Sequence, residues 1–288
     1  MYRAKLCLGL SESQFGLPLE EQIRLWRETG FEGFFTDWEY GADLRALRRT
    51  GDEEGMIFQS VHAPFTQINA LWKPMENTAA AVQEQIDCLR ACAEVQAPIM
   101  VMHPFIGFTE HEATQFGLDN FAQVADEARR LGVKIAIENV EGEEYLTALM
   151  AHFAGDNGVG FCWDTGHELC YNHGKDMLAL YGDRLLCTHL NDNLGIRDFG
   201  GEITWLDDLH LLPFDGIADW QDIAARLNRH GYDGILTFEL CTGSKPGRRD
   251  NDKYKRMDVR EYIAEAYARA CRVAALKLRD AASRKNSD

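Results

Sequence analysis

The chain has 288 residues, close to the about 250 residues of a single α/β barrel. Its net charge of -16 argues against nucleic acid as a partner, because binding to phosphates depends on clustered Lys and Arg. It contains no run of about 18 to 20 apolar residues, so we expect no membrane span, and residues 1–10 do not resemble a signal peptide, so we expect a cytoplasmic protein.

Short apolar runs alternate with helix-like stretches along the whole chain. The apolar runs predict strands at residues 5–10, 33–37, 56–62, 98–103, 133–138, 159–164, 185–189 and 234–240. The intervening stretches predict helices at residues 19–28, 43–49, 78–95, 120–131, 144–153, 175–181, 219–229 and 259–278. Because strands that alternate with helices form parallel sheets, we predict a single (β/α)8 TIM barrel of the α/β class over residues 1–282, with a polar tail at 283–288.

Residues of metal-ligand type stand at or near the ends of six predicted strands. They are His62, His103, Glu138, Asp164, His189 and Glu239. In a closed parallel barrel the carboxyl ends of the strands converge on one mouth. We therefore expect these side chains to lie close together.

Four of these residues follow consecutive predicted strands: Glu138, Asp164, His189 and Glu239. Three carboxylates and one imidazole suit a divalent cation such as Mn²⁺, Co²⁺, Mg²⁺ or Zn²⁺. Without a cation the carboxylates would repel one another and their pKa values would rise. A salt bridge or strand-end cap would explain any one of these residues, but four on successive strands favour one metal site.

Five residues are candidates for additional metal ligands or substrate contacts: His62, His103, His167, Asp208 and His210. Imidazole together with carboxylate is typical of zinc sites, so these residues could hold additional zinc ions. The same histidines could instead hydrogen-bond to substrate or to metal-binding carboxylates. The residues alone leave both interpretations open.

Three further residues are candidates for substrate binding. Trp38 follows a predicted strand, where it could line the substrate site or pack the loop. Asn191 and Arg197 lie in residues 191–215, a connection much longer than usual, and long loops in compact folds are commonly functional. Basic residues gather in residues 245–260, either as a solvated surface or as an anion site.

In strand order these residues resemble the xylose isomerase-like barrel superfamily, which includes sugar and sugar-phosphate isomerases and epimerases as well as endonuclease IV. The matching motifs are Glu138-Asn139, Asp164-Thr165-Gly166-His167, His189 and Glu239. They are similar to the D-tagatose 3-epimerase type, in which the corresponding residues hold one metal. The resemblance implies that Glu138 and Glu239 move the proton and that His167 contacts a substrate oxygen.

Endonuclease IV resembles the chain in another way, since each of its nine zinc ligands has a counterpart among the residues named above. The stretch from His189 to Asp192 also resembles its strand 7 motif. However, residues 211–216 resemble the sugar isomerase-like members more closely. Basic, aromatic-rich loops of the kind that bend DNA are not evident in the sequence.

The resemblance implies a divalent-metal-dependent isomerase or epimerase acting on a sugar, sugar phosphate or keto-polyol through a metal-stabilised enediolate; loss of water after proton abstraction would give a dehydratase. The alternative is an endonuclease IV-like multi-zinc phosphodiesterase, for which Asp208 and His210 would be essential. A binding protein without turnover is a third interpretation, but it would not need both Glu138 and Glu239. The expected partner is a small carbohydrate, and a homo-oligomer is compatible with the fold.

Overall fold

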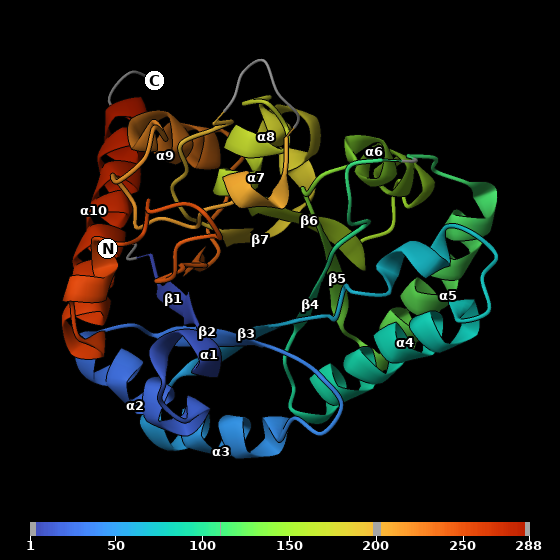
Figure 1. The fold of residues 1–288 in the computed structure, drawn as a ribbon, viewed down its shortest axis with the longest axis horizontal. Coiled ribbons are helices and arrows are strands. Elements are labelled where there is room, and N and C mark those ends of the chain that lie inside the picture. Colours follow the sequence, from blue (N-terminus) through green and yellow to red (C-terminus); the bar gives the residue numbers. More distant parts are fainter. Residues whose placement is uncertain (1–3, 110, 198–202, 286–288) are drawn as a thin grey trace.

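The parallel strands form a nearly closed barrel that is ringed by helices (Figure 1). The computed structural model describes residues 4–109, 111–197 and 203–285. The strands are β1 (Leu6–Gly9), β2 (Gly33–Asp37), β3 (Ile57–His62), β4 (Ile99–Met102), β5 (Lys134–Glu138), β6 (Val159–Asp164), β7 (Leu185–His189) and β8 (Leu236–Phe238). The predicted single (β/α)8 barrel is confirmed.

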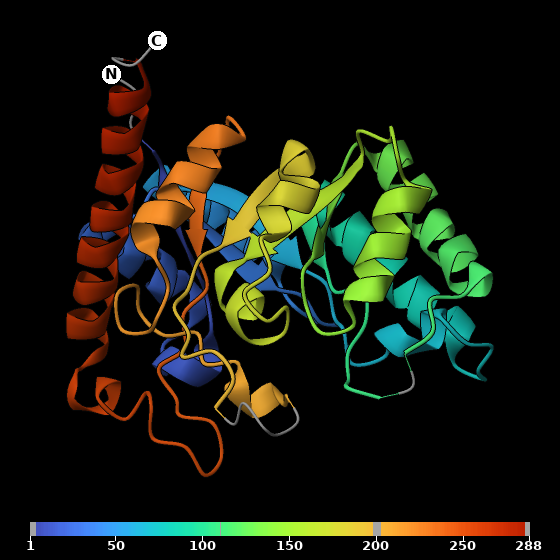
Figure 2. The same ribbon diagram turned by 90° about the horizontal axis from the view of Figure 1, so that it is seen from above.

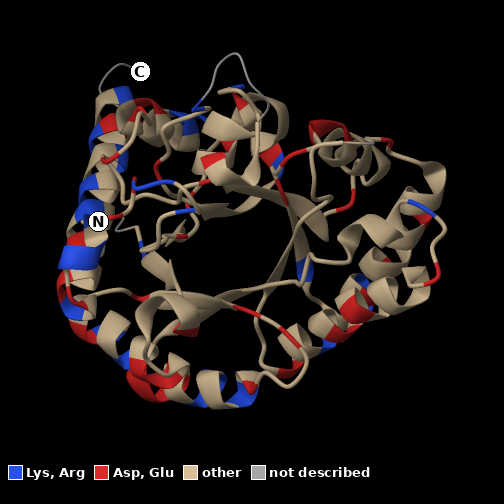
Figure 3. Cartoon of the chain, in the orientation of Figure 1, with Lys and Arg blue, Asp and Glu red and all other residues tan. Residues whose placement is uncertain are grey.

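Most of the helices lie on the outside of the barrel (Figures 1 and 2). They are α1 (Glu12–Phe15), α2 (Leu19–Thr29), α3 (Leu44–Glu54), α4 (Thr78–Glu94), α5 (Gln115–Leu131), α6 (Glu143–His152), α7 (Thr165–Cys170), α8 (Met177–Tyr181), α9 (Trp220–Arg229) and α10 (Val259–Lys285). Charged side chains concentrate on these outer helices (Figure 3). Within the described residues, no helix combines the length and the apolar character needed to cross a lipid bilayer.

The sheet order runs from β7 back to β1 and then to β8, so the barrel closes between β7 and β8. This seam is narrow. Leu190 donates its N–H to the carbonyl of Thr237 at 2.8 Å, and Glu239 donates to the carbonyl of Leu190 at 3.3 Å. The residues beside the seam, His189 and Glu239, are two of the predicted metal ligands.

The strands are apolar on both faces because one face meets the helices and the other fills the barrel. All six residues of β6 are buried, for example. Inside the barrel, Val101, Ala136, Cys162 and Cys187 form a small buried cluster. Side chains alternate along a strand, so these residues face the same side as the ligand-type residues two positions later. They form a floor of small side chains under the predicted site.

The bounds of β2, β6 and β7 match the predicted ones, and the remaining strands differ by one or two residues at an end. Two short helices, α1 and α7, were not predicted. Helix α5 begins earlier than expected because the hydroxyl of Thr114 accepts the N–H of Gly117 at 3.1 Å and caps it. Helix α10 continues to Lys285 rather than ending at residue 278, and the rest of the predicted tail, 286–288, lies outside the described residues.

Candidate metal centre

Four ligand-type residues meet at the C-terminal mouth of the barrel: Glu138, Asp164, His189 and Glu239. The first three end β5, β6 and β7, and the fourth directly follows β8. One ligand atom from each lies within 4.8 Å of the others. Glu138, Asp164 and His189 are fully buried. The closure of the barrel therefore brings these four predicted residues together.

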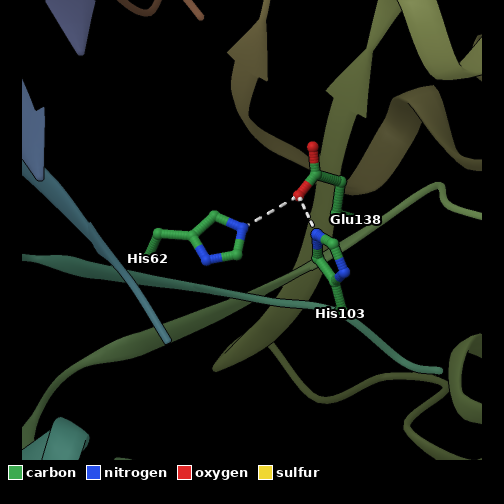
Figure 4. Close-up of side chains that lie close together, drawn as sticks. All are labelled: His62, His103 and Glu138. Atoms are coloured by element: carbon green, nitrogen blue, oxygen red, sulfur yellow. Dashed lines mark hydrogen bonds and ion pairs between the residues drawn. The ribbon is translucent and has the colours of Figure 1, made fainter. Parts of the chain in front are cut away.

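Glu138 lies among three histidines. Its Oε2 is 3.3 Å from Nε2 of His62 and 3.3 Å from Nε2 of His103 (Figure 4). Its Oε1 is 2.9 Å from Nδ1 of His189, and the same nitrogen is 2.9 Å from Oε2 of Glu239. Burial alone would raise the pKa of Glu138, but the histidines, His189 foremost, hold it well below the usual range.

The spacing of these atoms fits a bound cation. Two ligand atoms held at about 2.1 Å from one ion lie about 3.0 to 3.4 Å apart in octahedral or tetrahedral geometry. The distances around Glu138 and His189 lie between 2.9 and 3.3 Å. Within the described residues, neither Lys nor Arg pairs with Glu138, Asp164 or Glu239. A divalent cation is the counter-charge that this ligand set fits.

Three more ligand groups share a carboxylate with the first, and one of them is Glu138, Cys162 and His189. The other two add histidines: they are His62, His103 and Glu138, and Asp164, His167 and His210. Asp208 adjoins the latter group, since its Oδ1 lies 2.8 Å from Nε2 of His210 and 3.5 Å from Nε2 of His167. The structure thus brings together all nine residues that the sequence placed at the mouth, and we call them the nine-residue cluster.

The local backbone sets the orientation of His167, Asp208 and His210. His167 stands in the first turn of α7, where its N–H donates to Oδ1 of Asp164 at 2.6 Å and its Nδ1 lies 3.0 Å from the carbonyl of Asn139. His210 has a φ of 46°, a left-handed conformation that is uncommon for residues with a Cβ. Within this bend, both Asp208 and His210 face the other members of the nine-residue cluster.

A buried carboxylate fixes the long loop that carries Asp208 and His210. Asp192 accepts hydrogen bonds from the backbone N–H groups of Phe214 and Ala218 and from the indole of Trp220, at 2.9 to 3.0 Å. Its backbone also forms two hydrogen bonds of 2.9 Å with Leu211. Sequence reasoning had noted Asp192 only as part of a motif.

Two buried asparagines hold Asp164 in place. The side chain of Asn139 accepts the N–H of Asp164 and donates to its carbonyl, both at 2.8 Å. Asn191, which we predicted to bind substrate, is fully buried and donates to Oδ2 of Asp164 at 2.8 Å. The positioning role of Asn139 was not predicted, although an amide directly after a ligand at a strand end was its signal.

The other two predicted substrate residues, Arg197 and Trp38, are not members of the nine-residue cluster and follow different strands, β7 and β2. Arg197 is exposed and borders a cavity of about 550 Å³ with Arg248 and Arg249. Trp38 is buried beside β2, edge-on to Tyr40 with ring centroids 4.9 Å apart. It borders two cavities that are described below.

Burial and the charges of the cluster shift the pKa values of its members in opposite directions. Burial raises the pKa of Asp164 to about 6. Burial would also raise the pKa of Glu239, but His189 and His210 lower it to about 2. The pKa of His189 is held well above its usual value: burial opposes protonation, but Glu138 and Glu239 outweigh it. Without a metal, the cluster therefore favours a proton on His189 and negative charge on the glutamates, whereas burial lowers the pKa of His103.

The fold and this site define a class, the xylose isomerase-like TIM barrels, and the chain belongs to that family, whose model matches residues 23–274. Two curated relatives match in sequence. The uncharacterized protein y4fM of Sinorhizobium fredii is 28% identical over 261 residues, covering 77% of this chain and 80% of the relative. MJ1311 of Methanocaldococcus jannaschii is 24% identical over 195 residues, covering 62% of this chain and 63% of the relative.

Solved structures share the fold at low sequence identity. An IOLI protein with a bound zinc atom has a TM-score of 0.73 at 18% identity, covering 94% of this chain and 98% of that chain. An L-ribulose 3-epimerase has a TM-score of 0.70 at 15% identity, with 96% and 97% covered. A D-psicose 3-epimerase determined in the presence of D-fructose has a TM-score of 0.70 at 16% identity, with 94% and 99% covered.

Proposed function

We propose that the protein is a divalent-metal-dependent isomerase or epimerase of a sugar or keto-polyol. The observation that carries this proposal is the meeting of Glu138, Asp164, His189 and Glu239 within 4.8 Å at the ends of successive strands. Two glutamates in one such site supply both a metal-binding and a proton-transferring group. The epimerases among the structural neighbours agree with this chemistry.

Each glutamate has a role in this mechanism. A cation held by Glu138, Asp164, His189 and Glu239 would polarise the substrate carbonyl and stabilise the negative charge that develops. The side chain of Glu239 is 28% exposed at the mouth, where it can take the proton from the carbon next to the carbonyl. The side chain of Glu138 is 1% exposed, and its Oε2 lies 3.3 Å from Nε2 of His62, from which it can take a proton. Glu138 would pass that proton to the other face of the substrate for epimerisation, or to the neighbouring carbon for isomerisation.

The test is proton exchange in deuterated water. Protein reconstituted with Mn²⁺, Co²⁺, Mg²⁺ or Zn²⁺ is incubated with a panel of ketoses, and deuterium at the carbon beside the carbonyl is followed by NMR. We expect incorporation that depends on the metal and stops with chelator. A metal-loaded protein that exchanges no proton in any ketose would contradict the proposal.

A second candidate function is a multi-zinc phosphodiesterase. The observation that favours it is the continuity of the four ligand groups, which share Glu138 and Asp164 and could hold more than one ion. Two neighbouring ions can clamp the attacking and leaving oxygens of a phosphodiester. Elemental analysis separates the two candidate functions. About one ion per chain favours the isomerase. Two or three zinc ions per chain favour the phosphodiesterase, and cleavage of phosphodiesters and abasic DNA would then be assayed.

A further inference from the structure

The end of β2 adds two residues to the mouth that the proposed mechanism does not use. Asp37, the last residue of β2, pairs in register with His62 of the nine-residue cluster. Trp38 follows, and its backbone N–H donates to the carbonyl of His62 at 3.0 Å. Burial raises the pKa of Asp37, while the charges of His62, His189 and Glu239 also act on it. Asp37 therefore lies within electrostatic reach of the candidate metal centre.

Two cavities flank this pair. One, of about 610 Å³, lies beside β1 and β2, and the other, of about 450 Å³, lies between β2 and β3. Asp37, Trp38 and Glu39 border both, and His62 borders the smaller one. The smaller cavity thus connects the end of β2 directly to the nine-residue cluster. A sugar that reaches the metal centre has room to extend into it.

Asp37 and Trp38 present an acceptor and a donor without partners. The residue Trp38 is 9% exposed, and its indole N–H forms no hydrogen bond within the described part of the chain. The Asp37 carboxylate borders both cavities and likewise has no hydrogen bond or ion pair among the described residues. Because both groups border the smaller cavity and have no partner among the described residues, they are free to bind polar groups of a ligand there.

The walls of both cavities are negatively charged. The carboxylates that border them are Glu12, Glu20, Asp37, Glu39, Asp43 and Glu84, and neither lining contains Lys or Arg. Within the described residues none of these six is in an ion pair. Lys245 contacts the nine-residue cluster, but its ammonium group is paired with Asp208, 3.3 Å from Oδ2. A phosphate group in these cavities would be repelled by these carboxylates, and among the lining residues only His62 could offset that repulsion.

We propose that Asp37 and Trp38 bind hydroxyl groups of the substrate, and that the substrate is a polyol sugar without a phosphate group. The inference rests on the proposed function, because it describes the ligand of the same centre. Asp37 accepts a hydrogen bond from one hydroxyl, the Trp38 indole donates to another, and the aromatic rings of Trp38 and Phe65 offer apolar faces to the sugar.

The test is isothermal titration of the metal-loaded protein with D-xylulose, D-fructose and their terminal phosphate esters. We expect the free sugars to bind at least about tenfold more tightly than the esters. Asp37→Asn, and Trp38→Phe, which keeps a ring but removes the N–H, should each weaken sugar binding by about tenfold to a hundredfold. Glu53→Gln, which removes an exposed carboxylate of α3, should leave binding unchanged.

Three results would overturn the inference. In the first, the esters bind as tightly as the sugars. In the second, both variants keep the sugar affinity and the metal content of the unchanged protein. In the third, no sugar binds up to about 0.1 M, which is far above the millimolar range of weak ligands. Deuterium exchange measured in parallel separates this inference from the proposed function. Exchange that persists while Asp37→Asn binds normally contradicts only this inference. Sugar binding through Asp37 without any exchange contradicts only the proposed function.

Discussion

Glu138 and Glu239 each bring a carboxylate oxygen to 2.9 Å from the same atom, Nδ1 of His189. One ring N–H donates well to a single acceptor, so a hydrogen bond alone does not explain both approaches. A cation held by Glu138, His189 and Glu239 would account for both approaches. Its charge would also offset the repulsion between the two carboxylates.

Replacing Glu239 tests its role in proton transfer. Glu239→Gln keeps the size of the side chain but removes the base, so we expect deuterium exchange to fall by about 10²- to 10⁴-fold. The change is at a partly exposed position, so the fold should remain, as circular dichroism can verify. Metal content is measured on the same sample, because a variant that exchanges normally with its metal bound would remove Glu239 from this role.

The pair Asp208 and His210 distinguishes the two candidate functions. Asp208→Asn combined with His210→Ala removes ligands from one end of the nine-residue cluster and leaves the four-residue site intact. We expect ketose exchange to be largely retained and the zinc content to fall where more than one ion binds. Phosphodiester cleavage that is lost together with one zinc ion would support the hydrolase instead.

Gly166 tests how Asp164 is held. A Cβ at this position would lie 1.9 Å from Oδ1 of Asn191, whose amide donates to Asp164. Gly166→Ala should therefore displace Asn191 and weaken metal affinity by about 10- to 100-fold, although alanine favours the helix. Gly243→Ala is the control, because nothing lies within 4 Å of its added Cβ. Equal metal affinities for both variants would contradict this account of Asn191.

The pH dependence of the metal-free protein follows from His167. Burial opposes its protonation, but Asp164 and Asp208 raise its pKa to about 10. Its contribution to stability is complete below the unfolded pKa of about 6.5 and is lost as the pH rises towards 10. We expect the melting temperature of chelator-treated protein to fall over this window and His167→Asn to flatten the decline. Metal affinity should change in the opposite sense, rising with pH as protons leave the histidines.

A buried ion pair outside the site determines stability. Arg226 contacts Glu168 at 2.8 Å and stacks on Trp163, and both charged residues are largely buried. Arg226→Met would leave the Glu168 carboxylate unpaired, so we expect a loss of about 3 to 5 kcal/mol in the free energy of unfolding. Urea denaturation measures it. The exposed Arg229→Met should change stability by less than about 1 kcal/mol, and Glu168→Gln should recover part of the loss in Arg226→Met.

The strand ends could be predicted because each candidate ligand ends or directly follows an apolar run, as Asp164 ends β6. Their convergence required only the closure rule for parallel barrels. Helix α7 was not predicted because it begins within the Asp164-Thr165-Gly166-His167 motif. Asp164 is a candidate metal ligand there and also caps the N-terminus of the helix. No sequence pattern indicated that Asp192 would hold Phe214, Ala218 and Trp220 together, because these hydrogen bonds link residues 22 to 28 positions apart in the chain.

Two candidate metal ligands flank the seam between β7 and β8. His189 and Glu239 stand on opposite sides of the gap that only a few backbone hydrogen bonds cross within the described residues. An ion held by both residues would join β7 to β8 across this seam. Protein without the ion is therefore expected to open first along this seam, with the amides of Leu190 and Glu239 exchanging ahead of those in β5 and β6.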